Sequence, residues 1–459
     1  MRMEENKMRK NIMRILGIAL LTIILAVSCS MTGTVSEVQR TAGDRPGNPP
    51  GGKPGSGSSS SSITYSGAVE ISSADSQSGQ TYASSTTDES ALLVSTSEAV
   101  TIEDPTVTKS GSSNGGDNCN FYGLNAAVLV KGGSTTTITG GTITSDASGA
   151  NGVFSYGGNG GSNGAAGDGT TVIISDTTIT TSGSGSGGIM TTGGGITKAY
   201  NLTVTTSGQS SAAIRTDRGG GTVTVDGGTY TSNGLGSPAI YSTADITVGN
   251  ATLVSNLSEG VCIEGKNSIT LTDCNLTATN TKCNGNAKFL DTIMIYQSMS
   301  GDADSGTSSF TMTGGRLTSN KGHVFHVTNT NAVINLSKVE IVNNDGDVLL
   351  SVCDDGWSGA SNIATLNASD QTLSGTILVG SDSTFTLNLK DNSTFTGTFS
   401  GSITNAAGST VSTSVGTVNV TIESGSTWVL TADTYVSSLT NNGTLNRNGY
   451  TLYVNGTAY

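Results

Sequence analysis

The chain has 459 residues, of which 64 are glycine, and its formal net charge is −13 at neutral pH. Only 34% of the residues are hydrophobic and 12% are charged, both below the usual content of a globular enzyme. The acidic balance excludes a nucleic-acid-binding protein, because no basic stripe is present to neutralise phosphates. The regular spacing of Val, Ile and Thr indicates strands rather than disorder.

Residues 1–28 are predicted to be a signal peptide. A basic lead, MRMEENKMRKNIMR, precedes the apolar run ILGIALLTIILAV, in the order of a secretory signal. The segment Ala26–Cys29 (AVSC) resembles a bacterial lipobox, so Cys29 is the expected site of lipidation. An ordinary signal peptide and a short transmembrane anchor are the alternatives. With Ser30 after the cysteine, the lipobox resemblance implies a lipoprotein at the cell surface, anchored in the outer membrane.

Residues 29–62 are predicted to be a flexible linker that carries the lipid. The stretch DRPGNPPGGKPGSGSSSSS at 44–62 has too few apolar residues to form a core. The order of anchor, spacer and repeats is typical of a domain that is displayed at a surface.

The sequence after the linker repeats a cadence of strand, turn and strand. Apolar residues five positions apart recur at Ile102/Val107, Ile138/Ile143, Ile174/Ile179, Ala199/Val204, Val225/Tyr230, Val248/Leu253, Leu271/Leu276, Met312/Leu317 and Leu336/Ile341. Successive pairs are 23–26 residues apart, as from Val225 to Val248, except for three longer steps that fit insertions. Such a period is typical of solenoids, in which each unit buries its apolar face by stacking on the next.

The alternation within each unit favours strands over helices. In TVTV at 222–225, Val223 and Val225 share one face and the threonines share the other. A strand, a turn, a second strand and a polar corner form one coil of a parallel β-helix. We therefore predict an all-β, right-handed parallel β-helix over 63–365, with C-terminal coils and a cap over 366–459. Val225 is expected in the core between Ala199 and Val248.

Two stretches resemble known proteins. Residues 90–365 look like the right-handed parallel β-helix proteins, often called adhesin-like, that bacteria and archaea secrete. The stretch STWVLTADTYVSSLTNNGTLNRNGYTLYVNG at 426–456 is similar to the closing coils of autotransporter passenger domains. The resemblance implies a surface adhesion protein and supplies no catalytic residue.

The second strand of the units suggests a ligand-binding face. An inward ladder is expected at Val153, Ile189, Ile214, Ile240, Ile263, Ile295 and Phe325. The residues that follow point outward, and with Asp217 they form the candidate face: Phe154, Met190, Arg215, Asp217, Tyr241, Glu264, Tyr296 and His326. Aromatic rings beside hydrogen-bonding groups suit sugar rings, so the predicted ligand is a glycan. The alternative is that these side chains only shield the sheet.

Histidine and cysteine supply no predicted site. His323 and His326 are three residues apart and are expected on opposite faces of a strand, which argues against a two-histidine metal site. The cysteines lack the CxxC spacing of zinc and redox motifs, although a Cys274–Cys283 bridge would pin the insertion at 280–290.

Charged residues at the corners leave two further hypotheses. A polysaccharide lyase or glycoside hydrolase of the pectate-lyase-like type could use charged residues of the corners, but no segment matches such a signature. The candidates are Arg215, Asp217, Arg218, Asp302, Asp304, Asp345, Asp347, Asp354 and Asp355. Calcium between acidic corners is the second, with candidate ligands Asp302, Asp304, Asp345, Asp347, Asp354 and Asp355. Asp and Asn also occupy corners simply because turns require them.

The predicted function is lipid-anchored binding or adhesion at the cell surface, without catalysis. The expected partners are a membrane, through Cys29, and a glycan or host surface, and calcium is the one cofactor considered. A lyase or hydrolase of acidic glycans is the first alternative. A structural surface protein without a specific ligand is the second.

Overall fold

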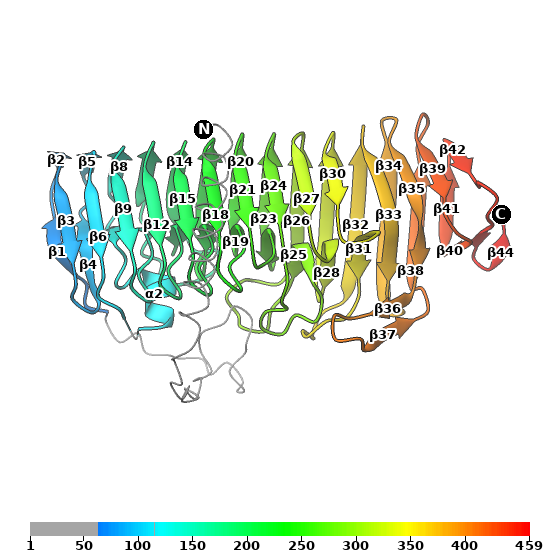
Figure 1. Cartoon of the computed structure of the whole chain (residues 1–459), viewed down its shortest axis with the longest axis horizontal. Helices are drawn as coiled ribbons and strands as arrows, with labels where there is room; N and C mark the ends of the chain where they lie inside the picture. Colours follow the sequence, from blue (N-terminus) through cyan, green and yellow to red (C-terminus); the bar gives the residue numbers. More distant parts are fainter. Residues whose placement is uncertain (1–62, 114) are drawn as a thin grey trace, which may run out of the picture. The chain divides into compact units, whose positions relative to one another are not determined.

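The structure is a computed structural model that describes residues 63–113 and 115–459. These residues form a right-handed parallel β-helix, as the sequence predicts, in which three long sheets run along the stack of coils (Figure 1). The predicted signal peptide, Cys29 and the linker lie outside the described residues. Within those residues, no helix combines the length and the hydropathy needed to cross a bilayer.

Each coil contributes one strand to each of two or three sheets. Sheet A comprises β1 (Ser66–Ile71), β4 (Glu89–Ser95), β7 (Val128–Lys131), β10 (Val153–Tyr156), β13 (Ile189–Thr192), β16 (Ile214–Thr216), β19 (Ile240–Ser242), β22 (Val261–Glu264), β25 (Asp291–Tyr296), β28 (His323–Thr328), β31 (Val348–Val352), β33 (Thr372–Val379), β35 (Thr394–Ser400), β39 (Thr427–Leu430) and β42 (Thr444–Asn446). Sheet B comprises β2 (Asp75–Ser78), β5 (Ala99–Glu103), β8 (Thr135–Thr139), β11 (Thr171–Ser175), β14 (Gly195–Tyr200), β17 (Gly221–Asp226), β20 (Asp245–Gly249), β23 (Ser268–Thr272), β26 (Thr307–Thr313), β29 (Asn331–Ser337), β32 (Asn362–Ser369), β34 (Ser383–Lys390), β38 (Thr417–Ile422) and β41 (Ser438–Asn441). Sheet C comprises β3 (Thr81–Ser84), β6 (Thr106–Lys109), β9 (Thr142–Ser145), β12 (Thr178–Thr181), β15 (Thr203–Thr206), β18 (Thr229–Ser232), β21 (Thr252–Ser255), β24 (Asn275–Ala278), β27 (Arg316–Ser319) and β30 (Glu340–Asn343).

The remaining elements are short. Sheet C ends at β30, and the coils that follow consist of longer strands in sheets A and B. An antiparallel hairpin is formed by β36 (Ser402–Thr404) and β37 (Thr410–Thr413). The small sheet of β40 (Thr434–Val436), β43 (Leu452–Val454) and β44 (Thr457–Ala458) lies at the C-terminal end. One short helix, α2 (Asp117–Tyr122), projects from the early coils of the described part.

The core has the register that the repeats predict. Val225 pairs with Ala199 on one neighbouring coil and with Val248 on the other, and it is 1% exposed. The other first members of the predicted pairs continue this ladder through sheet B, and the second members form a ladder in sheet C. Stacked Val, Ile and Leu side chains therefore fill the interior of each coil, where burial of apolar area stabilises the stack.

The turn between sheets B and C accounts for the five-residue spacing. It contains two residues in every coil from β5–β6 to β29–β30. Its first residue has positive φ, so Gly227 (φ 73°) or an Asn or Asp such as Asn201 (φ 51°) occupies it in all of these coils except the last, where it is Lys338 (φ 57°). A Cβ at Gly227 would lie 2.3 Å from Oδ1 of Asn201 on the neighbouring coil. The first positions of neighbouring turns therefore lie in close contact.

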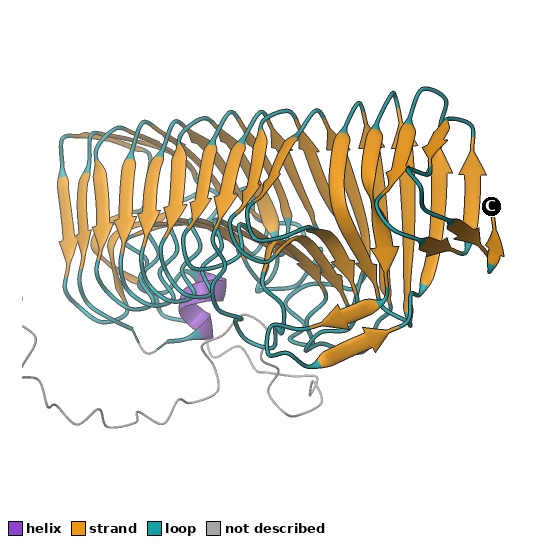
Figure 2. Ribbon diagram, turned by 45° about the vertical axis from the view of Figure 1, so that its right-hand side comes forward, coloured by secondary structure: helices purple, strands orange, loops and turns teal. Residues whose placement is uncertain are grey.

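The insertions lie on one side of the stack. Helix α2, the hairpin β36–β37 and the long loops are on this side in both views (Figures 1 and 2). By contrast, the outer face of sheet C carries a row of exposed threonines on successive coils: Thr106, Thr142, Thr178, Thr203, Thr229 and Thr252. The loop-covered outer face of sheet A is thus the part of the β-helix where side chains of varied chemistry gather.

Candidate functional site

The eight side chains predicted to form an open binding face lie on the outer side of sheet A but are buried. The most exposed of them, Arg215, is 6% exposed, and Phe154, Met190, Glu264 and His326 are 0% exposed. Loops and α2 cover them: Phe154 and Met190, for example, belong to a cluster that packs against Tyr122 of α2. The sequence shows which side chains leave the core, but the covering loops have no periodic pattern. These residues therefore form a second layer rather than an open surface.

The register of this second layer differs from the expected one at two coils. Ile240 pairs with Val261, whereas Ile263 pairs with Ser242, so the predicted ladder is offset by two residues there. The outward neighbour of Tyr241 is consequently Cys262 rather than Glu264. A slip of two residues leaves every side chain on the same face, so the period of two cannot reveal it.

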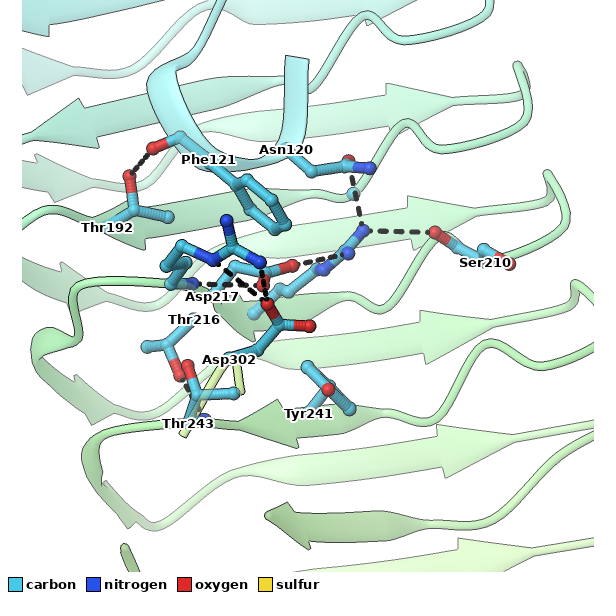
Figure 3. A network of polar contacts seen from close by, with 12 residues as sticks. Asn120, Phe121, Thr192, Ser210, Thr216, Asp217, Tyr241, Thr243 and Asp302 are labelled. Carbon is cyan, nitrogen blue, oxygen red and sulfur yellow. Dashed lines mark hydrogen bonds and ion pairs between the residues drawn. The ribbon is translucent and has the colours of Figure 1, made fainter. Parts of the chain in front are cut away.

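An arginine–aspartate network joins α2 to the coils (Figure 3). Arg215 donates to Asp217 at 2.6 Å and to the side-chain oxygen of Asn120 at 3.3 Å. Arg218 donates to Asp302 at 2.6 Å and lies over the ring of Phe121, with 4.3 Å from its Cζ to the ring centroid.

Asp217 is the carboxyl group at the centre of this network, and its pKa is shifted. Burial raises the pKa of Asp217 to about 7, although the charge of Arg215 opposes the shift. The residues proposed for lyase chemistry are thus engaged with one another, and Arg215 and Asp217 are shielded from solvent.

A second network surrounds Glu264. Its carboxylate accepts hydrogen bonds from the hydroxyls of Tyr241 at 2.5 Å and Tyr296 at 3.0 Å, and from Ser298 and Ser300. Burial raises the pKa of Glu264, while the hydrogen bonds oppose that shift. The tyrosine rings pack with Trp357, whose ring centroid is 4.9 Å from that of Tyr296. The two rings therefore serve packing, and their hydroxyls serve Glu264.

The two histidines do not point to opposite faces, so that prediction is wrong. Nδ1 of His323 and Nδ1 of His326 both lie 2.7 Å from the hydroxyl of Ser351. The strict alternation fails here, because the consecutive residues Val324 and Phe325 of β28 both enter the core.

The same histidines complete a buried polar chain. Nε2 of His326 lies 3.1 Å from Oδ2 of Asp355, which gives a Ser351–His326–Asp355 arrangement. Ser351 and His326 are 0% exposed, and the ring of Phe289 lies over His326 at a centroid distance of 4.7 Å. Nucleophilic catalysis by a serine requires access to the substrate, and this serine has none in the structure.

The six aspartates considered as calcium ligands have protein partners. Four of them pair with basic groups: Asp302 with Arg218, Asp304 with Lys266, Asp345 with Lys321 and Asp355 with His326. Asp347 accepts from the hydroxyl of Thr376 at 3.0 Å, and Asp354 accepts from Asn362 at 2.6 Å. Over residues 63–113 and 115–459, no three His, Cys, Asp or Glu side chains converge as metal ligands.

The Cys274–Cys283 bridge is not formed. Cys274 occupies the second position of a two-residue turn and points into the core, where it is 0% exposed. Cys283 lies on the other side of sheet A and packs beside Cys262 in the second layer. Among the described cysteines, Cys119, Cys262, Cys274, Cys283 and Cys353 are all free thiols.

An open cavity of about 490 Å³ lies where three insertions meet. Lys288 comes from the loop after β24, Asp354 and Asp355 from the loop after β31, and Asn405 from the hairpin β36–β37. The backbone N–H of Ala406 donates to the carbonyl of Lys288 at 2.9 Å, and the N–H of Lys288 donates to Asp355 at 2.6 Å. These bonds hold the three walls together.

The lining of this cavity is mixed. Ser409 and Thr410 add hydroxyls, and Ala407 and Val411 add apolar surface. Sequence analysis singled out Asp354 and Asp355 but missed Lys288 and the hairpin, because these lie in insertions far apart in the sequence. A much smaller cavity of about 20 Å³, lined by residues that include Glu259, Tyr241 and Trp357, has room for about one water molecule.

The covered side of sheet A thus contains both closed polar networks under the loops and an open cavity between insertions. Comparisons of the chain with protein-family models, curated proteins and solved structures give no match.

Proposed function

We propose that the protein is a lipid-anchored cell-surface protein that binds a glycan without catalysis, in the cavity between the three insertions. The observation that carries the proposal is the size and lining of this cavity. Its volume of about 490 Å³ falls in the range of ligand sites, about 300–1,000 Å³. The lipobox-like Ala26–Cys29 and the spacer at 44–62 support the surface location.

The lining suits a ligand with several hydroxyls. Lys288 offers an ammonium donor and Asp354 a carboxylate acceptor, and both are exposed. Ser409 and Thr410 offer hydroxyls that donate and accept. Beside them, the apolar side chains of Ala407 and Val411 suit the C–H faces of a sugar ring. This mixture favours a carbohydrate over a purely apolar ligand or a simple anion.

The experiment compares the binding of the full chain and its variants to a glycan array. Lys288→Ala and Asp354→Ala should each weaken binding by about 10–100-fold, because each removes a charged hydrogen-bonding group. Lys282→Ala is the matched control, since Lys282 is an exposed lysine of the same loop that does not line the cavity. Equal binding by all variants, or no glycan bound by the parent, would refute the proposal.

The same preparation separates binding from catalysis. The parent protein is incubated with polygalacturonate and other acidic polysaccharides, with and without calcium, and unsaturated and reducing-end products are measured. We expect no product, because Arg215 and Asp217 are buried and ion-paired. Product formation that depends on either residue would replace the binding function with a lyase or hydrolase function.

A further inference from the structure

A pair of buried carboxylates lies outside the cavity of about 490 Å³ and outside both networks described above, although one of them, Glu259, also lines the small cavity of about 20 Å³. Asp291 begins β25, and Glu259 lies just before β22 on the neighbouring coil of sheet A. Asp291 is 0% exposed and Glu259 is 4% exposed. Neither takes part in an ion pair between described residues. Two acidic groups are thus buried together without a basic side chain to neutralise them.

Several oxygen atoms at this place lack hydrogen-bond donors. Both carboxylate oxygens of Asp291 and the side-chain oxygen of Asn280 are buried and have no partner. Asn280 is 0% exposed and lies against both acids, because its Nδ2 donates to the backbone carbonyl of Asp291 at 3.2 Å and its side chain is hydrogen-bonded to Glu259. The hydroxyl of Ser258 also donates to Glu259, so the unsatisfied carboxylate oxygens here are those of Asp291. Buried polar atoms nearly always have partners, so something must satisfy these oxygens.

Protonation of Asp291 would satisfy only part of this group of unpartnered oxygens. Burial raises the pKa of Asp291 well above its ordinary value, and the nearby Glu259 and Asp355 raise it further. A protonated Asp291 could donate one hydrogen bond, but the oxygen of Asn280 would still compete with the second carboxylate for it. His323, which pairs with Asp291 on the next coil, does not supply a charge, because burial lowers its pKa to about 3.

We propose that Glu259, Asn280 and Asp291 hold a calcium ion between two neighbouring coils. Their carboxylate and amide oxygens are the hard ligands that calcium prefers, and Asp291 can bind through both oxygens. Two carboxylates match the charge of a divalent cation. Calcium also accepts irregular coordination, whereas magnesium demands octahedral geometry and retains its waters.

The neighbouring thiols do not favour a softer metal. Cys262 and Cys283 lie near Glu259 and Asp291, and burial raises the pKa of both, for Cys283 to about 11. A thiol binds metal as the thiolate, which is scarce at neutral pH when the pKa is raised. The site therefore differs in residues and in chemistry from the corner aspartates that the sequence suggested as calcium ligands.

The first test measures the melting temperature of the full chain after treatment with EGTA and during titration with calcium chloride. The parent should show a saturable rise in melting temperature, because an ion that binds only the folded state stabilises it. Asp291→Asn should abolish this rise and weaken calcium binding, measured by calorimetry, by more than the 10–100-fold that loss of an outer-shell partner costs.

Controls make the result specific. Asp304→Asn, which removes an exposed carboxylate that is paired with Lys266, should respond to calcium like the parent. Glu259→Gln provides a second site variant should Asp291→Asn fail to fold. The proposal is overturned if the parent binds no calcium, or if both site variants keep the calcium-dependent rise. A parent that is destabilised by rising pH but indifferent to calcium would show that protons satisfy the pair instead.

Discussion

Replacement of Tyr241 tests whether the covered face of sheet A serves packing or display. Tyr241 is 4% exposed, and its hydroxyl donates to Glu264 at 2.5 Å. Tyr241→Phe removes one of four hydroxyl donors from a buried carboxyl group and should cost about 1.5–3 kcal/mol of unfolding free energy at pH values where that group is ionised. Tyr241→Ala also removes the ring from the cluster with Met294 and Trp357 and should cost at least about 3–5 kcal/mol.

The pH dependence follows from Glu264. Burial raises its pKa in the folded state, so its contribution to stability is present below the unfolded pKa and is lost as pH rises through the folded pKa. Loss of the Tyr241 donor raises that pKa further, because this hydrogen bond favours the charged form. The penalty of Tyr241→Phe should therefore shrink to about 0.5–1.5 kcal/mol near pH 4, where the carboxyl group is protonated.

Urea unfolding over a series of pH values from about 4 upward measures both effects, because the pKa of Glu264 is raised and the penalty should grow as pH rises through it. Tyr200→Phe is the control, because Tyr200 lies on β14 and is 38% exposed. An unchanged stability in Tyr241→Phe would refute the packing argument. A penalty independent of pH would refute the assigned role of Glu264.

Three further predictions concern the core, a histidine and the anchor. Val225→Asp should cost several kcal/mol and lower the melting temperature, whereas Thr224→Asp on the exposed face of the same strand should change it little. His323 has its pKa lowered to about 3, so the unfolded chain binds its proton first and stability falls as pH drops below about 6.5, by at most about 1.4 kcal/mol per pH unit. His323→Gln should flatten this part of the stability profile, and an identical profile would contradict the assignment. Cys29→Ser should abolish labelling by a fatty-acid analogue, and equal labelling of both forms would rule out the anchor.

The fold could be predicted because it follows from local features of the sequence, namely the period-two alternation and the repeat length. The alternation in TVTV and the constant two-residue turn place Val225 correctly without knowledge of any other part of the chain. The covered face could not be predicted in the same way. Whether Tyr241 is open or buried depends on loops such as 279–290, whose positions follow from tertiary contacts rather than from a repeating pattern.

The errors at single residues have the same origin. Glu264 was placed beside Tyr241 because a shift of two residues preserves the alternation, and only the observed pairing with Cys262 corrects it. His323 and His326 were placed on opposite faces because strict alternation was assumed, whereas the consecutive residues Val324 and Phe325 of β28 both enter the core. A period-two pattern contains no information about such an interruption of the alternation.

The placement of the insertions explains why side chains of varied chemistry collect on one side of this β-helix. The turn between sheets B and C keeps two residues in every coil from β5–β6 to β29–β30. The corners that flank sheet A also contain close approaches, since a Cβ at Gly234 would lie 1.7 Å from the carbonyl oxygen of Gly208, yet the three long steps of the repeat all place their extra residues at these corners. Insertions from separate coils, such as the loop with Lys288 and the hairpin β36–β37, can then meet over sheet A. Variation confined to these corners would change ligand recognition while it leaves the stacked core intact.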